Sequence, residues 1–312
     1  MLESRSVKYS FPAIALNQNC SSQGALIEAE AGRPLDDLDP RWLLQQLKTH
    51  GYLLLRGFDT DLDGFCAVVR RHSSRITLDP ARNFQGGDVA QKVDAGTDAM
   101  GLHLENGNSP FRPELVWFYC ARAARQGSQT TVCDGCRVWE RMTDLARERF
   151  YGSELLYRRR VDEQKWKRFV YHQTGGSIPL EKIRISDLLA LVESEGSTTI
   201  EAAANGAIVY SFRTPAVQQT LFKSGLAWAN SIFGPSYNYE APEITFGNGD
   251  GIPASLLEEM RTLTADLTDD IEWRSGDVAL IDNTRVMHGR RAILDTGRQI
   301  FNALSYVDAR LL

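Results

Sequence analysis

Apolar residues follow two different spacings in the first half of the chain. In residues 39–58, DPRWLLQQLKTHGYLLLRGF, they recur at helical spacing from Trp42 to Leu47, after an Asp-Pro start signal. Gly51 separates them from a short apolar run at residues 52–55. This pattern predicts a helix that leads into a buried strand. Residues 113–121, PELVWFYCA, are rich in β-forming residues that would point to both faces, which indicates a strand covered on two sides.

The middle of the chain predicts a strand followed by helices. GSQTTVCDG (residues 127–135) is typical of a strand that begins and ends in turns, and a helix is expected around residues 136–150. Residues 180–204 have a helical and acidic pattern, which favours a helical insertion beside the core. FGNGDGI (residues 246–252) is interpreted as a turn, because no lysine follows at the spacing of a phosphate-binding loop.

The C-terminal part predicts a helix and then a series of short strands. The helix is expected over residues 253–267, with a proline at its start, and the strands within residues 271–307. Short strands at this spacing favour a sandwich or jelly roll wrapped by helices. We therefore expect one domain over residues 1–312, mainly β with flanking helices (α+β).

Composition and charge exclude several classes of protein. With 43% hydrophobic and 24% charged residues, the 312-residue chain can form a substantial core. Its formal net charge of −5 argues against nucleic acid or an anionic membrane as the main partner. The densest basic cluster, Arg158 to Arg160, is interpreted as a solvated strand edge. No stretch approaches about 18 consecutive apolar residues, so we expect a soluble, cytoplasmic protein. A homo-oligomer is compatible with the sequence.

The cysteines do not indicate a disulfide framework. Five cysteines are an odd and low number for this length. Cys133 and Cys136 form a C-x-x-C, but the chain has no second C-x-x-C and no H-x-x-x-H that would complete a zinc site. Redox or metal use of this pair is therefore the less favoured interpretation.

His103 and Glu105 stand two positions apart in GLHLENGNSP, residues 101–110. On a strand, side chains at this spacing leave the same face about 7 Å apart, so the two could converge on one ion. H-x-E also occurs by chance, and a metal site needs a third ligand. His288, in DNTRVMHGRR, stands between an apolar strand and several arginines. A buried core histidine is an equally good interpretation of His288 taken alone.

Three further histidines offer weaker candidates. His50 and His72 stand near the ends of predicted helices, where a histidine is commonly a cap. His172, in VYHQTGG, could face a substrate. By contrast, His103, Glu105 and His288 together would be the ligand set of non-heme Fe(II) oxygenases, which leaves open positions on the metal.

A 2-oxo acid that chelates such an iron would need a cation for its far carboxylate. Arginine suits this task because its planar fork makes two parallel hydrogen bonds to a carboxylate. Arg298, at the start of the apolar run IFNALSYV, is the best placed candidate. Arg290 and Arg291 stand closer to His288, and strand alternation would put Arg290 on its face and Arg291 opposite.

The order of these motifs resembles a known superfamily. H-x-E, GSQTTVCDG, FGNGDGIP, WRSGDVALIDNTRVMHGRRAI and Arg298 follow one another as in taurine dioxygenase, clavaminate synthase and γ-butyrobetaine hydroxylase. The pattern W-x-x-G-D-x-x-x-x-D-N-x-x-x-x-H-G-R is the most specific part. The resemblance implies a double-stranded β-helix (jelly roll) and an Fe(II)- and 2-oxoglutarate-dependent dioxygenase that also consumes O2.

The resemblance also implies residue roles. His103, Glu105 and His288 would bind iron, while Arg298 and Thr130 would bind 2-oxoglutarate; the spacing of ten from His288 keeps Arg291 as an alternative to Arg298. Glutamate at position 105 is similar to clavaminate synthase and to oxygenases of amino acids. Halogenating relatives have a small residue there, so the carboxylate favours hydroxylation.

The implied reaction is hydroxylation of an unactivated C–H bond in a small molecule, an amino acid or amino-acid-derived intermediate of specialised metabolism. Desaturation or ring closure at the same iron, and a non-catalytic binding protein on the same fold, stay open as alternatives. The substrate candidates include an aromatic group at 228, 233, 237 and 239, which could embrace a cationic amine. The polar substrate candidates are Asn106, Asn230, His172, Arg122 and Arg290.

Overall fold

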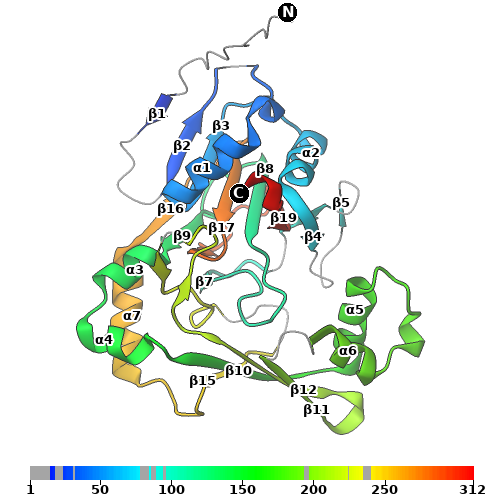
Figure 1. The fold of residues 1–312 in the computed structure, drawn as a ribbon. Helices are drawn as coiled ribbons and strands as arrows, with labels where there is room; N and C mark the ends of the chain where they lie inside the picture. Colours follow the sequence, from blue (N-terminus) through cyan, green and yellow to red (C-terminus); the bar gives the residue numbers. More distant parts are fainter. Residues whose placement is uncertain are drawn as a thin grey trace, which may run out of the picture.

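The computed structural model describes residues 15–17, 24–30, 32–77, 84–85, 89–93, 96–192, 197–223, 225–234 and 240–312. Within these residues the largest sheet has the strand order β1-β2-β3-β17-β8-β19-β6-β5, and β4 also pairs with β19 (Figure 1). Its strands are β1 (Ala15–Asn17), β2 (Ala25–Glu28), β3 (Tyr52–Arg56), β4 (Ser73–Thr77), β5 (Phe84–Gln85), β6 (Ala90–Lys92), β8 (Leu115–Arg122), β17 (Val278–Asp282) and β19 (Gln299–Val307).

Two smaller sheets complete most of the β-structure that is described. One has the order β16-β9-β18-β7, and the other has the order β11-β12-β10-β15. The first is made of β16 (Thr268–Ile271), β9 (Thr130–Asp134), β18 (Val286–Arg290) and β7 (Met100–His103). The second is made of β11 (Thr198–Ala202), β12 (Ile208–Pro215), β10 (Glu154–Val161) and β15 (Glu243–Phe246), and β13 (Gln218–Gln219) pairs separately with β14 (Leu226–Ala227).

Helices lie around these sheets. Helices α1 and α2 lie beside the large sheet; α3, α4 and α7 form a group at one side of the molecule; α5 and α6 lie next to β10 and β12 (Figure 1). Their bounds are α1 (Pro40–His50), α2 (Leu62–His72), α3 (Gly135–Arg141), α4 (Asp144–Phe150), α5 (Glu163–Gln173), α6 (Ile185–Val192) and α7 (Ala254–Asp266). The predicted start and end of α1 are confirmed, because Asp39 accepts a hydrogen bond from the Trp42 amide and Gly51 follows with a φ of 77°.

The predicted two-sided burial of residues 113–121 is also confirmed. In β8, Leu115, Trp117 and Tyr119 belong to the core beneath α1 and α2. The alternate residues Val116 and Phe118, together with Cys120, belong to a second core with residues of β9 and β18. The large sheet is therefore covered on both faces, by helices on one and by the β16-β9-β18-β7 sheet on the other.

Several predictions differ from the structure. The segment 180–204 is helical in α6 but extended in β11, where Thr and Ile at 198–200 pair with β12. β-branched side chains favour an extended chain, and this outweighed the helical pattern. The helix expected around residues 136–150 is two helices, because Thr143 accepts a hydrogen bond from the Ala146 amide and starts a new one. The residues 271–277 contribute only Ile271 to a strand.

Arg158 and Arg160 of the arginine cluster are solvated and Arg159 is only partly exposed, and the cluster does not lie on an edge strand. β10 lies between β12 and β15. Arg158 pairs with Glu201 at 3.9 Å and Arg160 with Asp162 at 2.6 Å, and all four side chains are largely exposed. Arg159 lies over the ring of Tyr210.

The C-x-x-C cysteines are poor candidates for metal or redox chemistry. Burial raises the pKa of Cys133 and of Cys136 to about 12 in each case. Thiolate is the form that binds metals and attacks disulfides, and it is disfavoured at both positions. These cysteines are therefore packing residues in β9 and α3.

A buried ion pair links two neighbouring segments of the β16-β9-β18-β7 sheet. Arg285 donates to both carboxylate oxygens of Asp134, with an Nη2–Oδ2 distance of 2.6 Å, and the Asp134 side chain is only 2% exposed. Asp134 also accepts a hydrogen bond from the Cys136 amide at the start of α3. The pair thus fixes the end of β9 to the turn before β18.

We expect Arg285→Met to lower the free energy of unfolding by about 3–5 kcal/mol, because it leaves the Asp134 carboxylate buried without its cation. Urea denaturation measures this loss. Arg160→Met removes an exposed pair and is the control, with an expected change below about 1 kcal/mol. Equal losses in the two variants would contradict the assignment.

No helix in the described part of the chain is long and apolar enough to cross a membrane.

Candidate metal centre

Adjacent strands bring two histidines together. His103 is the last residue of β7, and it is directly opposite His288 of β18 in the antiparallel register. The centroids of the two rings are 4.5 Å apart. Gly289 allows this close approach of the strands, because a Cβ at that position would lie 2.5 Å from the carbonyl oxygen of Met100. The glycine of H-G-R is thus required by the packing of β18 on β7.

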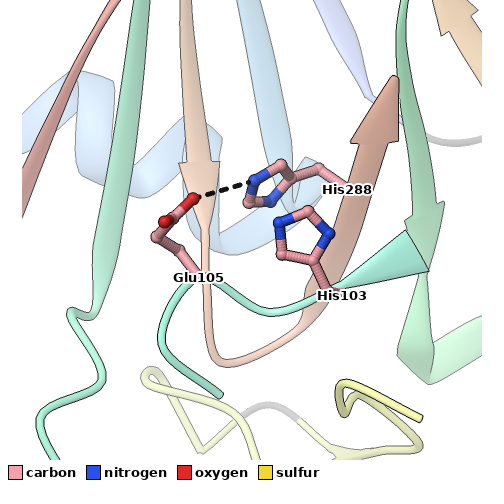
Figure 2. Close-up of side chains that lie close together, drawn as sticks. All are labelled: His103, Glu105 and His288. Atoms are coloured by element: carbon pink, nitrogen blue, oxygen red, sulfur yellow. Dashed lines mark ion pairs between the residues drawn. The ribbon is translucent and has the colours of Figure 1, made fainter. Parts of the chain in front are cut away.

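Glu105 reaches the same place by a different route from the one expected. It lies outside β7, in a turn that begins after Leu104, so the prediction that His103 and Glu105 share one strand face is wrong. Its Oε2 nevertheless lies 3.3 Å from Nε2 of His288 (Figure 2). One possible ligand atom from each of His103, Glu105 and His288 lies within 4.8 Å of the others. The three predicted residues therefore converge.

The histidine rings are oriented by their surroundings. Nδ1 of His103 lies 2.9 Å from the carbonyl oxygen of Gly101. When Nδ1 carries the proton and donates to this carbonyl, the lone pair of Nε2 is available to a metal ion. The ring of Phe118 packs edge-on against His288 at 5.5 Å between centroids. Among the described residues, Nδ1 of His288 has no hydrogen-bond partner although it is buried.

This donor set fits Fe(II). Two imidazoles and one carboxylate on one side of an ion leave positions for other ligands on the opposite side. A carboxylate so close to an imidazole also supplies the negative charge that a divalent cation requires. The arrangement can therefore hold a metal ion and still bind small molecules to it.

The three residues line a pocket with a cavity volume of about 30 Å³. Besides His103, Glu105 and His288, the polar side chains of this pocket come from β9, β18, β19 and the residue just before β19. The other lining residues are Val93, Met100, Phe118, Thr130, Gly289, Arg290, Arg298, Ile300 and Asn302.

Arg298 lies in this pocket, whereas Arg291 does not. The Arg298 side chain is buried, and its Nη2 donates to the carbonyl oxygen of Val93 at 2.9 Å. Arg291 points outward and pairs with Asp270 at 3.0 Å. Arg290 lies on the His288 face, as strand alternation predicts, and donates to the carbonyl oxygens of Gly96 and Asp98. The position of the side chains thus favours Arg298 over Arg291.

Thr130 lines the pocket with its hydroxyl group already used as an acceptor. Nε1 of Trp273 donates to Oγ1 of Thr130 at 3.0 Å. Since indole N–H can only donate, the Thr130 hydroxyl proton can be given to another acceptor. Trp273 is the tryptophan of W-x-x-G-D, and the sequence alone did not reveal this contact.

Several substrate candidates lie elsewhere. Arg122 is exposed, and its Nε donates to the carbonyl oxygen of Gly297, so it supports the turn before Arg298. His172 lies on α5 outside the pocket. Asn230 is buried in a loop, where its Oδ1 accepts from the Ile232 amide. Asn106 directly follows Glu105 with a φ of 52° but does not line the pocket.

The aromatic group predicted as a substrate cage is part of the core where it is described. Trp228 is fully buried against Phe150, and Phe233 packs on Trp228 and Arg261. Residues 237 and 239 lie outside the described residues. The prediction that Trp228 binds a cationic amine is therefore wrong, because protein encloses its ring.

His50 and His72 are the last residues of α1 and α2, as predicted. His72 is fully buried, with Nδ1 at 2.7 Å from the carbonyl oxygen of Val68 and its ring against Trp117. Burial lowers the pKa of His72, which keeps the imidazole neutral.

Sequence reasoning missed Asn302, which is buried in the pocket wall. The signal was available, because Asn302 stands four positions after Arg298, and residues 298, 300 and 302 share one face of an extended chain.

Comparisons with known proteins identify the family of the chain. Residues 18–304 match the model of the family described as taurine catabolism dioxygenase TauD, TfdA family. A clavaminate synthase-like protein of Arabidopsis thaliana is 28% identical over 214 residues, which cover 62% of this chain and 60% of that protein. The dapdiamide synthesis protein DdaC of Enterobacter agglomerans is 22% identical over 303 residues, covering 90% of this chain and 87% of that protein.

Solved structures share the fold. A taurine dioxygenase from Burkholderia xenovorans superimposes with a TM-score of 0.63 at 14% identity, covering 95% of this chain and 92% of that one. PvcB from Pseudomonas aeruginosa superimposes with a TM-score of 0.59 at 16% identity, covering 90% and 85%. PvcB is described as an Fe, alpha-ketoglutarate dependent oxygenase. Because the family match spans most of the chain, the protein belongs to the TauD/TfdA family and is an iron- and 2-oxoglutarate-dependent dioxygenase.

Proposed function

We propose that His103, Glu105 and His288 bind Fe(II), and that the enzyme hydroxylates an unactivated C–H bond of an amino acid or an amino-acid-derived intermediate. The observation that carries this proposal is the convergence of three donor atoms in one pocket with a buried arginine and a threonine hydroxyl. We further propose a single oxygenase domain in which the two sheets that share β8's second core form a double-stranded β-helix, with an insertion around residues 180–204.

Arg298 and Thr130 are proposed to bind the far carboxylate of 2-oxoglutarate. The guanidinium donates to the carbonyl oxygen of Val93, which orients its fork, and the Thr130 hydroxyl, which accepts from Nε1 of Trp273, keeps its proton to donate. The apolar side chains of Phe118 and Ile300 keep bulk water from this region. Iron with bound 2-oxoglutarate supplies the oxidising chemistry, and the chain's own residues hold and orient the reactants.

The substrate class rests on relatives. DdaC is named for dapdiamide synthesis, and PvcB is described as coming from an isonitrile synthetic pathway. These names support a substrate in specialised metabolism. Asn302 and Arg290 are the polar pocket residues proposed to face it.

Succinate release in a screen of amino acids and their derivatives tests this function. The proposal requires that at least one of these compounds stimulates turnover of 2-oxoglutarate, with Fe(II) and O2 present. The product mass then separates hydroxylation, which adds an oxygen atom, from desaturation or ring closure, which removes two hydrogens. No stimulation by any member of the class, with turnover by another class, would contradict the proposed substrate.

Trp273→Phe is expected to raise KM for 2-oxoglutarate about threefold to tenfold with little change in kcat, because one hydrogen bond that fixes Thr130 is lost. Steady-state kinetics with varied 2-oxoglutarate measure it. Thr130→Val should raise KM at least as much, and Trp273→Phe should add almost nothing in that background. Additive effects would show that Trp273 does not act through Thr130.

A further inference from the structure

The position of Glu105 raises the question of what fixes it. The strand β7 ends at His103, so Glu105 has no place in a strand ladder that would hold its backbone. A ligand on a turn must be held by other contacts if it is to keep its distance from His288. Preorganised metal sites depend on such supporting contacts.

Asn283 provides these contacts. Its Oδ1 accepts a hydrogen bond from the Glu105 amide at 2.9 Å, and its Nδ2 donates to the Glu105 carbonyl oxygen at 3.0 Å. A side-chain amide thus binds both polar groups of the Glu105 backbone, as a neighbouring strand would. The side chain of Asn283 is fully buried, so these bonds are made out of contact with water.

Asn283 also makes hydrogen bonds at the far end of the segment that follows Glu105. Nδ2 of Asn283 also donates to the carbonyl oxygen of Pro113 at 2.8 Å, and the Asn283 amide donates to the carbonyl oxygen of Glu114. The two ends of the segment 105–113 are therefore tied to one residue. That residue stands in the turn between β17 and β18, five positions before His288.

We propose that Asn283 is the positioning residue of the metal-binding carboxylate: it fixes the Glu105 backbone to the turn that leads into the strand of His288. This inference rests on the proposed iron site. It gives the D-N-x-x-x-x-H motif a physical meaning, because one short segment carries both a histidine ligand and the side chain that holds the carboxylate ligand. Asn283 itself does not line the pocket.

Mn(II) affinity of the metal-free protein tests the proposal without turnover. Free Mn(II) is measured by electron paramagnetic resonance during titration of wild type, Asn283→Ala and Asn283→Asp. We expect both variants to bind Mn(II) at least about tenfold more weakly. Asn283→Asp is nearly isosteric and keeps the acceptor for the Glu105 amide, but it presents a carboxylate oxygen to two carbonyls, so it remains informative if Asn283→Ala does not fold.

Thr284→Val is the matched control. Thr284 is buried in the same turn, and its hydroxyl donates to Asp282 and accepts from the Leu221 amide. It should lower the thermal unfolding temperature and leave Mn(II) affinity within about twofold. In a Glu105→Ala background, Asn283→Ala should cause no further loss of Mn(II) affinity, since the carboxylate that it positions is gone.

The outcomes separate the two proposals. Wild type that does not bind Mn(II) would overturn the iron site and this inference with it. Wild type that binds, with unchanged affinity in a folded Asn283 variant, would overturn the inference alone. A loss in Asn283→Ala that persists in the Glu105→Ala background would show a general structural effect and would also overturn it.

Discussion

Glu105→Ala is expected to reduce substrate-dependent succinate formation by more than about a hundredfold. Removal of this carboxylate takes away one of three proposed iron ligands and the negative charge beside His288. Loss of residues that only support metal ligands costs about 10- to 100-fold, and loss of a ligand itself should exceed this. Succinate release measured at saturating 2-oxoglutarate checks the expectation.

Glu105→Gln separates charge from shape. It keeps the size of the side chain and should retain the fold, while the neutral amide is a poor iron ligand. We expect its activity to fall nearly as far as that of Glu105→Ala. Full activity in either variant would remove Glu105 from the proposed triad.

Arg298→Gln is expected to raise KM for 2-oxoglutarate at least about thirtyfold with a smaller change in kcat. Truncation of one partner of a buried, hydrogen-bonded charge pair costs about 2–5 kcal/mol, and a cost of about 2 kcal/mol corresponds to this factor. The effect falls on KM because the far carboxylate is distant from the reacting bonds. Steady-state kinetics with varied 2-oxoglutarate measure both constants.

Arg291→Gln is a matched control for this variant. Arg291 is exposed and pairs with Asp270 outside the pocket, so its loss should leave KM within about twofold. The sequence left these two arginines as alternatives. An increase of KM in Arg291→Gln instead of Arg298→Gln would reverse the assignment.

Much of the fold was predictable where apolar residues recur at a regular spacing and end signals mark the limits of the element. The helix at 40–50, the buried strand after it and the two-sided strand β8 follow from apolar spacing and from Asp39 and Gly51 as end signals. In the segment 198–202, the β-branched side chains at 198–200 favour an extended chain that pairs with β12, although the residues before them have a helical pattern.

The candidate site was predictable in its residues and only in part in its geometry. His103, Glu105 and His288 do converge, although Glu105 lies on a turn. Asn283 and Trp273 were missed as functional residues because their role depends on partners more than 100 positions away. Such contacts become visible only when the sheet register is known.

Anaerobic addition of Fe(II) and 2-oxoglutarate to the metal-free protein tests the central claim most directly. Chelation of iron by the 2-oxo acid produces a visible charge-transfer band, and we expect a stoichiometric band in wild type. His288→Ala should not form it, and Arg298→Gln should form it only at higher 2-oxoglutarate concentration. A wild-type protein without the band, or a His288→Ala variant with an unchanged band, would contradict the proposed iron site.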